Sequence, residues 1–81
     1  MHQFSQHFIE QMEIRNIGMD VATDVLNNPQ HTTKEDELIV YQKLINKNNK
    51  QYLLRIFVNE IKYPPVVVTG YLTSKINKYL P

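Results

Sequence analysis

The chain has 81 residues, no cysteine, two glycines and a formal net charge of +1 at pH 7. This length allows one domain with a modest core, because a domain of this size buries only about 60–65% of the surface that its unfolded chain exposes. The absence of cysteine excludes disulfides, thiol nucleophiles and cysteine-based metal sites. No segment approaches the run of about 20 apolar residues that spans a bilayer. We therefore expect a single cytoplasmic domain, residues 1–81, with no membrane partner.

Charge is divided unevenly along the chain. Residues 1–40 carry a net charge of −5 and residues 41–81 a net charge of +6. A cationic surface built from the second half suits a phosphate polymer such as RNA. The alternative is that the lysines only keep the surface soluble. The charge pattern permits RNA as a partner without deciding between these interpretations.

Apolar residues at helical spacing predict two short N-terminal helices. The first carries an apolar stripe between Phe4 and Met12, and Ser5 is placed to cap it by accepting a first-turn N–H. The second is predicted over residues 19–27. It ends before Pro29, because the residue before a proline avoids helical geometry.

The remainder of the chain predicts strands. Leu38–Ile45 and Gln51–Asn59 are rich in β-branched and aromatic residues around a polar turn, which indicates an antiparallel hairpin. Val66–Leu72 is a third strand, Gln30–Thr33 is a candidate fourth, and residues 73–80 suit a terminal helical turn. The predicted fold class is α+β, with two N-terminal helices packed on one face of a three- to four-stranded antiparallel sheet.

Strand alternation separates the two faces of this sheet. The side chains that we expect to be buried under the helices are Phe8 or Ile9, Met12, Val21, Val25, Leu26, Leu54, Ile56, Val58 and Val68. The side chains that we expect on the other face are Arg55, Thr69 and Tyr71, joined by Tyr41 and Lys43 from the neighbouring strand.

Arg55 is the most informative polar residue, because it stands in the middle of an apolar strand. An arginine there must either be paired or face an anion, since burying it unpaired is too costly. The sequence leaves both readings open: an ion pair with Glu10, Glu13 or Glu60, or a contact with phosphate.

The first helix carries a second candidate group. His7, Gln11 and Arg15 are spaced four residues apart and form one polar ridge. An imidazole exchanges protons near neutral pH and a guanidinium matches phosphate oxygens, so the ridge suits phosphodiester chemistry. The alternative is that the two ends of this ridge only close the ends of the helix. No metal site or cofactor is expected, because the histidines are scattered and the acidic run Glu35–Glu37 is typical of a solvated turn.

The segment Phe4–Ile17 resembles the opening of a family of small prokaryotic proteins of unknown function, whose pattern reads S-x-H-(A)-x-x-R-M-x-x-R-(G)-I. Val25–Pro29 resembles the turn that follows, and Leu54–Ile56 and Val67–Tyr71 resemble later landmarks. The family is similar in layout to the RelE-like and BrnT-like ribonuclease toxins, which place helices before an antiparallel sheet and cleave RNA without a metal.

The resemblance implies roles for particular residues, with RNA as substrate and a cognate antitoxin as partner. The implied catalytic residues are His7, Arg15, Arg55 and Tyr71, and the implied nucleic-acid contacts are Lys43, Lys75 and Thr69. Two positions depart from the pattern: Gln11 stands where an arginine is usual, and Asn16 replaces the common glycine.

A second hypothesis is a non-catalytic module that binds a partner protein or forms a homodimer. Its binding surface would be the exposed sheet face with Leu53, Phe57, Val67 and Tyr71. The two hypotheses differ in their salt dependence, since RNA binding weakens strongly with salt.

Overall fold

Two helices form the N-terminal part of the computed structural model, which describes residues 1–81. These are α1 (Gln6–Ile14) and α2 (Met19–Asn27), close to the predicted boundaries. Ser5 caps α1 as expected, because its Oγ accepts a hydrogen bond from the backbone N–H of Phe8 at 3.0 Å. The same hydroxyl donates to the carbonyl of Val68 at 2.7 Å, which fixes the start of α1 to the sheet.

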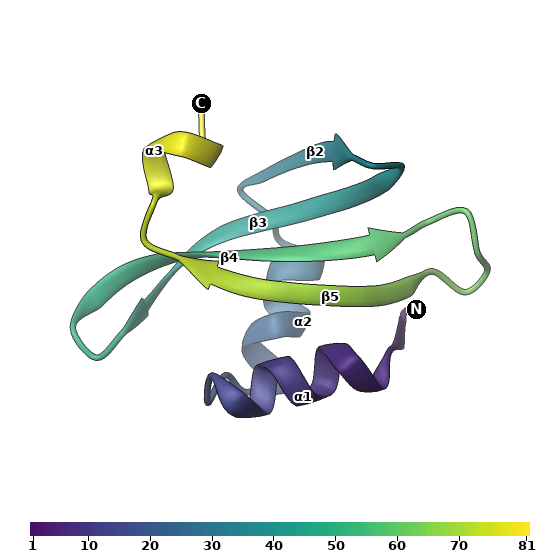
Figure 1. The fold of residues 1–81 in the computed structure, drawn as a ribbon, viewed down its shortest axis with the longest axis horizontal. Coiled ribbons are helices and arrows are strands. Elements are labelled where there is room, and N and C mark those ends of the chain that lie inside the picture. The colour runs from purple at the N-terminus through teal and green to yellow at the C-terminus, as the bar shows by residue number, and fades with distance from the viewer.

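The sheet has five strands in the order β1-β5-β4-β3-β2 (Figure 1). Four of them form an antiparallel meander: β2 (His31–Glu35), β3 (Leu38–Lys47), β4 (Lys50–Asn59) and β5 (Val66–Thr73). The fifth strand, β1 (Gln3–Phe4), pairs in parallel with β5. The prediction of three to four antiparallel strands was therefore wrong in number and in pairing. A strand of two residues is too short to show any alternation.

Two tight turns set the register of the meander. Asp36 and Glu37 join β2 to β3, and Asn48 and Asn49 join β3 to β4. All four have positive φ, at 50°, 65°, 53° and 63° respectively. Two-residue turns with positive φ at both positions match the right-handed twist of the strands that they join.

Helices α1 and α2 cover one face of the sheet, which we call the helix face (Figure 1). The apolar core lies between them and consists of Phe8, Met12, Ile17, Ala22, Val25, Leu26, Leu54, Ile56, Val58 and Val67. Gly70 allows α1 to approach β5 closely. A Cβ at this position would lie 3.0 Å from the ring of Phe8 and 3.2 Å from the carbonyl oxygen of Arg55.

Two predicted core residues are only partly buried: Val21, which still packs against the apolar core, and Val68, whose predicted place in the core was wrong. Val67 is fully buried and Val68 only partly so. The pairing of β4 with β5 shifts between Phe57, which faces Thr69, and Val58, which faces Val67. The bulge leaves one extra residue in β5, so the residues before and after it alternate out of phase. Val67 therefore points to the helix face although it is two residues from Thr69.

The last element, α3 (Ile76–Tyr79), is a single turn that follows β5 and lies on the side of the sheet away from α1 and α2 (Figure 1). We call this side the Arg55 face. None of the three helices combines the length and the apolar character needed to cross a membrane.

Candidate functional site

Four directly paired strand residues form a polar row across the Arg55 face. His31 of β2 pairs with Gln42 of β3, Gln42 with Arg55 of β4, and Arg55 with Tyr71 of β5. Residues directly opposite each other in an antiparallel sheet point to the same face. The four side chains, which we call the polar row, therefore stand side by side across four strands.

Hydrogen bonds connect the polar row from end to end. Arg55 donates from Nε to Oε1 of Gln42, from Nη1 to Tyr71 Oη at 2.6 Å, and from Nη2 to the carboxylate of Glu35. Nε2 of Gln42 lies 2.9 Å from Nδ1 of His31. Because Oε1 of Gln42 accepts from Arg55, its amide nitrogen must donate to His31. Nδ1 of His31 is then an acceptor, and its ring proton lies on Nε2.

Tyr79 of α3 covers the hydrogen-bonded network on the side away from the sheet. The Arg55 guanidinium carbon lies 3.9 Å from the centre of the Tyr79 ring, and 5.3 and 5.7 Å from the ring centres of Phe57 and Tyr71. Nε2 of Gln42 also donates to the carbonyl of Tyr79 at 3.4 Å. As a result Arg55 is only 2% exposed and Gln42 is fully buried. The cation holds α3 against the sheet.

The protonation of this cluster follows from its contacts. Burial lowers the pKa of Arg55, but its hydrogen bonds with Tyr71 and Glu35 outweigh burial and the net shift is upward. Burial raises the pKa of Tyr71, whereas its hydrogen bond to Tyr79 lowers the pKa of Tyr79. Arg55 therefore remains a cation and Tyr71 a neutral phenol.

The ion-pair partner of Arg55 differs from the three that the sequence suggested. The partner is Glu35, and not Glu10, Glu13 or Glu60. Glu35 belongs to the acidic run that we expected to be a solvated turn. The turn is present, but Glu35 is the last residue of β2, and its side chain points to the Arg55 face.

His7 reaches the rim of the same face. Its Nε2 lies 3.0 Å from Oγ1 of Thr69. Thr69 pairs with Phe57, whose ring stacks on that of Tyr71 with centres 6.0 Å apart. Strand β1 covers β5 only beside Val66 and Val67, so the edge of β5 is open to α1 at Thr69. Four predicted site residues, His7, Thr69, Tyr71 and Arg55, are thus brought to one face and its rim.

The other three predicted site residues lie elsewhere. Arg15 follows α1 on the helix side, where its Nη1 donates to Gln11 Oε1 at 2.5 Å. Lys43 pairs with Leu54 and so points to the helix face, with its Nζ 2.7 Å from Asp24 Oδ2. Lys75 is exposed immediately before α3.

Both Tyr41 and Lys43 were predicted to lie on the Arg55 face, and both placements were wrong. The register of β3 turns these two side chains to the helix face. Tyr41 pairs with Ile56 on the helix face and donates to the Glu60 carboxylate. Gln42, between these two residues, points to the Arg55 face instead. Val40 and Leu44, two positions before and after Gln42, are apolar and lie on the same face as Gln42. An amide in such an apolar row was the sequence signal that Gln42 is buried.

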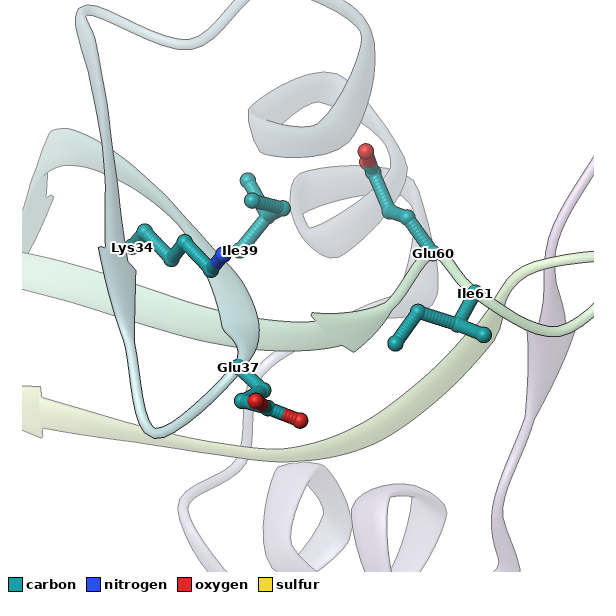
Figure 2. A pocket seen from close by; sticks show the side chains of 5 residues that line it. All are labelled: Lys34, Glu37, Ile39, Glu60 and Ile61. Atoms are coloured by element: carbon teal, nitrogen blue, oxygen red, sulfur yellow. The ribbon is translucent and has the colours of Figure 1, made fainter.

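A shallow cavity of about 290 Å³ lies near the acidic turn, lined by Lys34, Glu37, Ile39, Glu60 and Ile61 (Figure 2). Ile39 pairs with Val58, so the cavity belongs to the helix face and is separate from the polar row. No group of three or more histidine, cysteine, aspartate or glutamate side chains is placed to hold a metal ion.

The surface expected for the non-catalytic hypothesis is not present in the predicted form. Leu53 is fully buried on the Arg55 face, and Val67 is buried on the helix face. Phe57 and Tyr71 are partly buried beside the guanidinium of Arg55.

Comparisons of this chain with protein-family models, with curated proteins and with solved structures find no match.

Proposed function

We propose that this domain binds single-stranded RNA at the rim formed by His7, Thr69 and Tyr71, and cleaves it without a metal ion. The observation that supports this proposal is the contact between His7 and Thr69, two residues along β5 from the Tyr71–Arg55 hydrogen bond. The exposed imidazole therefore contacts β5 two residues from a phenol that is held by a cation. The resemblance to the RelE-like and BrnT-like toxins supports the same class of reaction.

In this reaction the 2′-hydroxyl of the RNA attacks the adjacent phosphate and the 5′-oxygen leaves. A base removes the hydroxyl proton and an acid protonates the leaving oxygen. His7 acts as the base that takes the proton of the 2′-hydroxyl, because its imidazole is exposed and held by one hydrogen bond. Tyr71, a neutral phenol two residues from Thr69 along β5, acts as the acid that gives its proton to the leaving 5′-oxygen.

Arg55 has a different role in this proposal from the phosphate clamp that the sequence suggested. Its Nε, Nη1 and Nη2 are bonded to Gln42, Tyr71 and Glu35, and the Tyr79 ring covers it. Arg55 is therefore a positioning residue, which orients the hydroxyl of Tyr71.

The flanking phosphates would be bound along β5. Every second residue of β5 from Thr69 onward points to the same face, in the direction of exposed Lys75; these residues are Thr69, Tyr71 and Thr73. Residues 61–81 contain no carboxylate side chain. A chain of phosphates that runs from His7 toward Lys75 meets only neutral or cationic side chains of this segment. Such contacts position a nucleic acid without reading its sequence.

The experiment is cleavage of a labelled single-stranded RNA by the purified protein in EDTA. His7→Gln should lower the rate about 10²- to 10⁴-fold, the usual range for loss of a proton-transfer group. His2→Gln is the matched control, because His2 packs against Tyr41 of the helix face. Equal rates for His7→Gln and the wild-type protein, or no cleavage by the wild-type protein, would contradict the proposal.

One observation favours a second candidate function, a non-catalytic binding module. Every Arg55 nitrogen already has a partner within the chain, which is typical of a structural cation. This candidate predicts that RNA, if bound at all, is released intact from the wild-type protein and from His7→Gln alike.

A further inference from the structure

Strand β2 has an unpaired edge. It is the last strand in the order of the sheet and pairs only with β3, so no strand lies along its outer side (Figure 1). The opposite edge differs, because the two-residue β1 covers the start of β5 and leads directly into α1. All five β2 residues are partly or fully exposed.

The turn between β2 and β3 decides which backbone groups of β2 are unpaired. In a hairpin with a two-residue turn, the flanking residues form a hydrogen-bonded pair, here Glu35 with Leu38. Every second residue from Glu35 then bonds to β3. The N–H and C=O groups of Thr32 and Lys34 point outward, away from the sheet.

We propose that β2 pairs antiparallel with β2 of a second copy of this chain, about a two-fold axis at Thr33. Outward-pointing residues must oppose one another, so Thr32 of each copy faces Lys34 of the other. About four backbone hydrogen bonds form between the copies. The interface is self-complementary, as a two-fold axis requires.

Side-chain charge selects this register over its neighbours. A shift in one direction places the two Lys34 ammonium groups directly opposite each other, which is destabilising. A shift in the other direction pairs Thr32 with itself and leaves the charged groups of β2 without a partner. With the axis at Thr33, His31 of each copy faces Glu35 of the other.

The hydrogen bonds inside the chain prepare His31 and Glu35 for this contact. Gln42 holds the Nδ1 of His31, which leaves Nε2–H free to donate. The side chain of Glu35 is 42% exposed although one of its oxygens binds Arg55, so it can accept a further hydrogen bond. The polar row of one copy would thus connect to that of the second copy.

Single cysteines test the register directly, because the chain contains no cysteine. Thr33→Cys places two thiols opposite each other in a pair without backbone hydrogen bonds, where the Cα atoms approach within disulfide range. We expect covalent dimers of Thr33→Cys under mild oxidation, and at least tenfold fewer for Lys34→Cys and Thr32→Cys. Equal yields for all three, or a higher yield for either control, would overturn the proposal.

Sedimentation equilibrium provides the second measurement. Thr32→Pro removes an outward N–H and leaves the bonds to β3 in place, whereas Thr32→Val keeps that N–H. We expect a concentration-dependent dimer for the wild-type protein and Thr32→Val, and at least tenfold weaker association for Thr32→Pro. A wild-type protein that stays monomeric at millimolar concentration, or equal association of all three proteins, would refute the dimer. Neither experiment depends on RNA cleavage.

Discussion

The two faces of the sheet are stabilised by different interactions. On the helix face, ten buried apolar residues form one cluster between the helices and the strands. On the Arg55 face, one buried guanidinium binds Gln42, Tyr71 and Glu35 and stacks under Tyr79. Apolar contacts are non-directional, so the helix face tolerates exchange of similar side chains. The bonds of Arg55 are directional, and they require one register of four strands.

This difference shows how a domain with a small core obtains a defined sheet. Burying a cation is costly unless its partners are all in place. The partners of Arg55 come from β2, β3, β5 and α3. If any of these strands shifted its register by one residue, its side chain that contacts Arg55 would move to the opposite face of the sheet. We infer that the polar row specifies strand register, while the helix face supplies most of the stability.

The largest effect is expected on the helix face. Leu54→Ala should lower the free energy of unfolding by about 2–5 kcal/mol, because Leu54 is fully buried in the apolar cluster. The total for a domain of this length is about 4–12 kcal/mol, so the variant should be close to unfolding. Urea denaturation measures the effect. An unchanged midpoint would mean that Leu54 does not contribute to the core.

The next effect tests the Arg55 face. Glu35→Gln keeps the shape of the side chain and removes the charge that faces Arg55, and it should cost about 1–3 kcal/mol of unfolding free energy. Glu37→Gln is the matched control, because Glu37 is exposed and stands two residues away, in the turn that follows β2. It should stay within about 0.5 kcal/mol of the wild-type protein. Equal effects of the two substitutions would show that the charge on Glu35 does not matter.

A smaller effect should appear only in alkali. Burial, together with the hydrogen bond to the Glu60 carboxylate, raises the pKa of Tyr41 from 10.0 to about 12. The folded state therefore keeps a proton that the unfolded state loses, and stability falls as the pH rises from about 10 to about 12. Full burial would make this loss about 2.7 kcal/mol. We expect about 1 kcal/mol because solvent screens the pair.

Tyr41→Phe isolates this contribution, since the other groups that titrate in alkali are common to both proteins. The difference in unfolding free energy between the two proteins should shrink as the pH rises through this range. A difference that stays constant between pH 9 and pH 12 would contradict the assignment.

The smallest effect lies in acid. The hydrogen bond from Lys43, with one from Asn28, lowers the pKa of Asp24 from its ordinary value of 3.8. Stability from this pair is therefore present above that value and is lost as the pH falls below it. Asp24→Asn should flatten the acid limb of the unfolding curve slightly, and added salt should reduce the difference from the wild-type protein. Identical acid limbs would show that this exposed pair has no net effect.

Local patterns were sufficient for much of the fold. The two N-terminal helices, the Ser5 cap and the three long strands depend on residues close together in the sequence. The face of β4 was also predictable, because strict alternation puts Leu54 and Arg55 on opposite sides. The same rule puts Thr69 and Tyr71 on one side of β5, but that Arg55 shares this side depends on the pairing of β4 with β5.

Other features depended on contacts between distant segments. The bulge beside Val68 inverted part of β5, and the register of β3 put Gln42, not Lys43, beside Arg55. The choice of Glu35 as the ion-pair partner required both the turn after β2 and the pairing of two further strands.

The sequence by itself determined that Arg55 would lie in the middle of a strand and would need a partner, since that requirement is a property of a cation among apolar neighbours. Only the tertiary structure decided which carboxylate and which aromatic ring become the partners of Arg55. Glu35 is 20 residues away along the chain and Tyr79 is 24 residues away. Directional bonds of this kind depend on where the strands place each atom, whereas periodicity records only which side of its own strand a residue occupies.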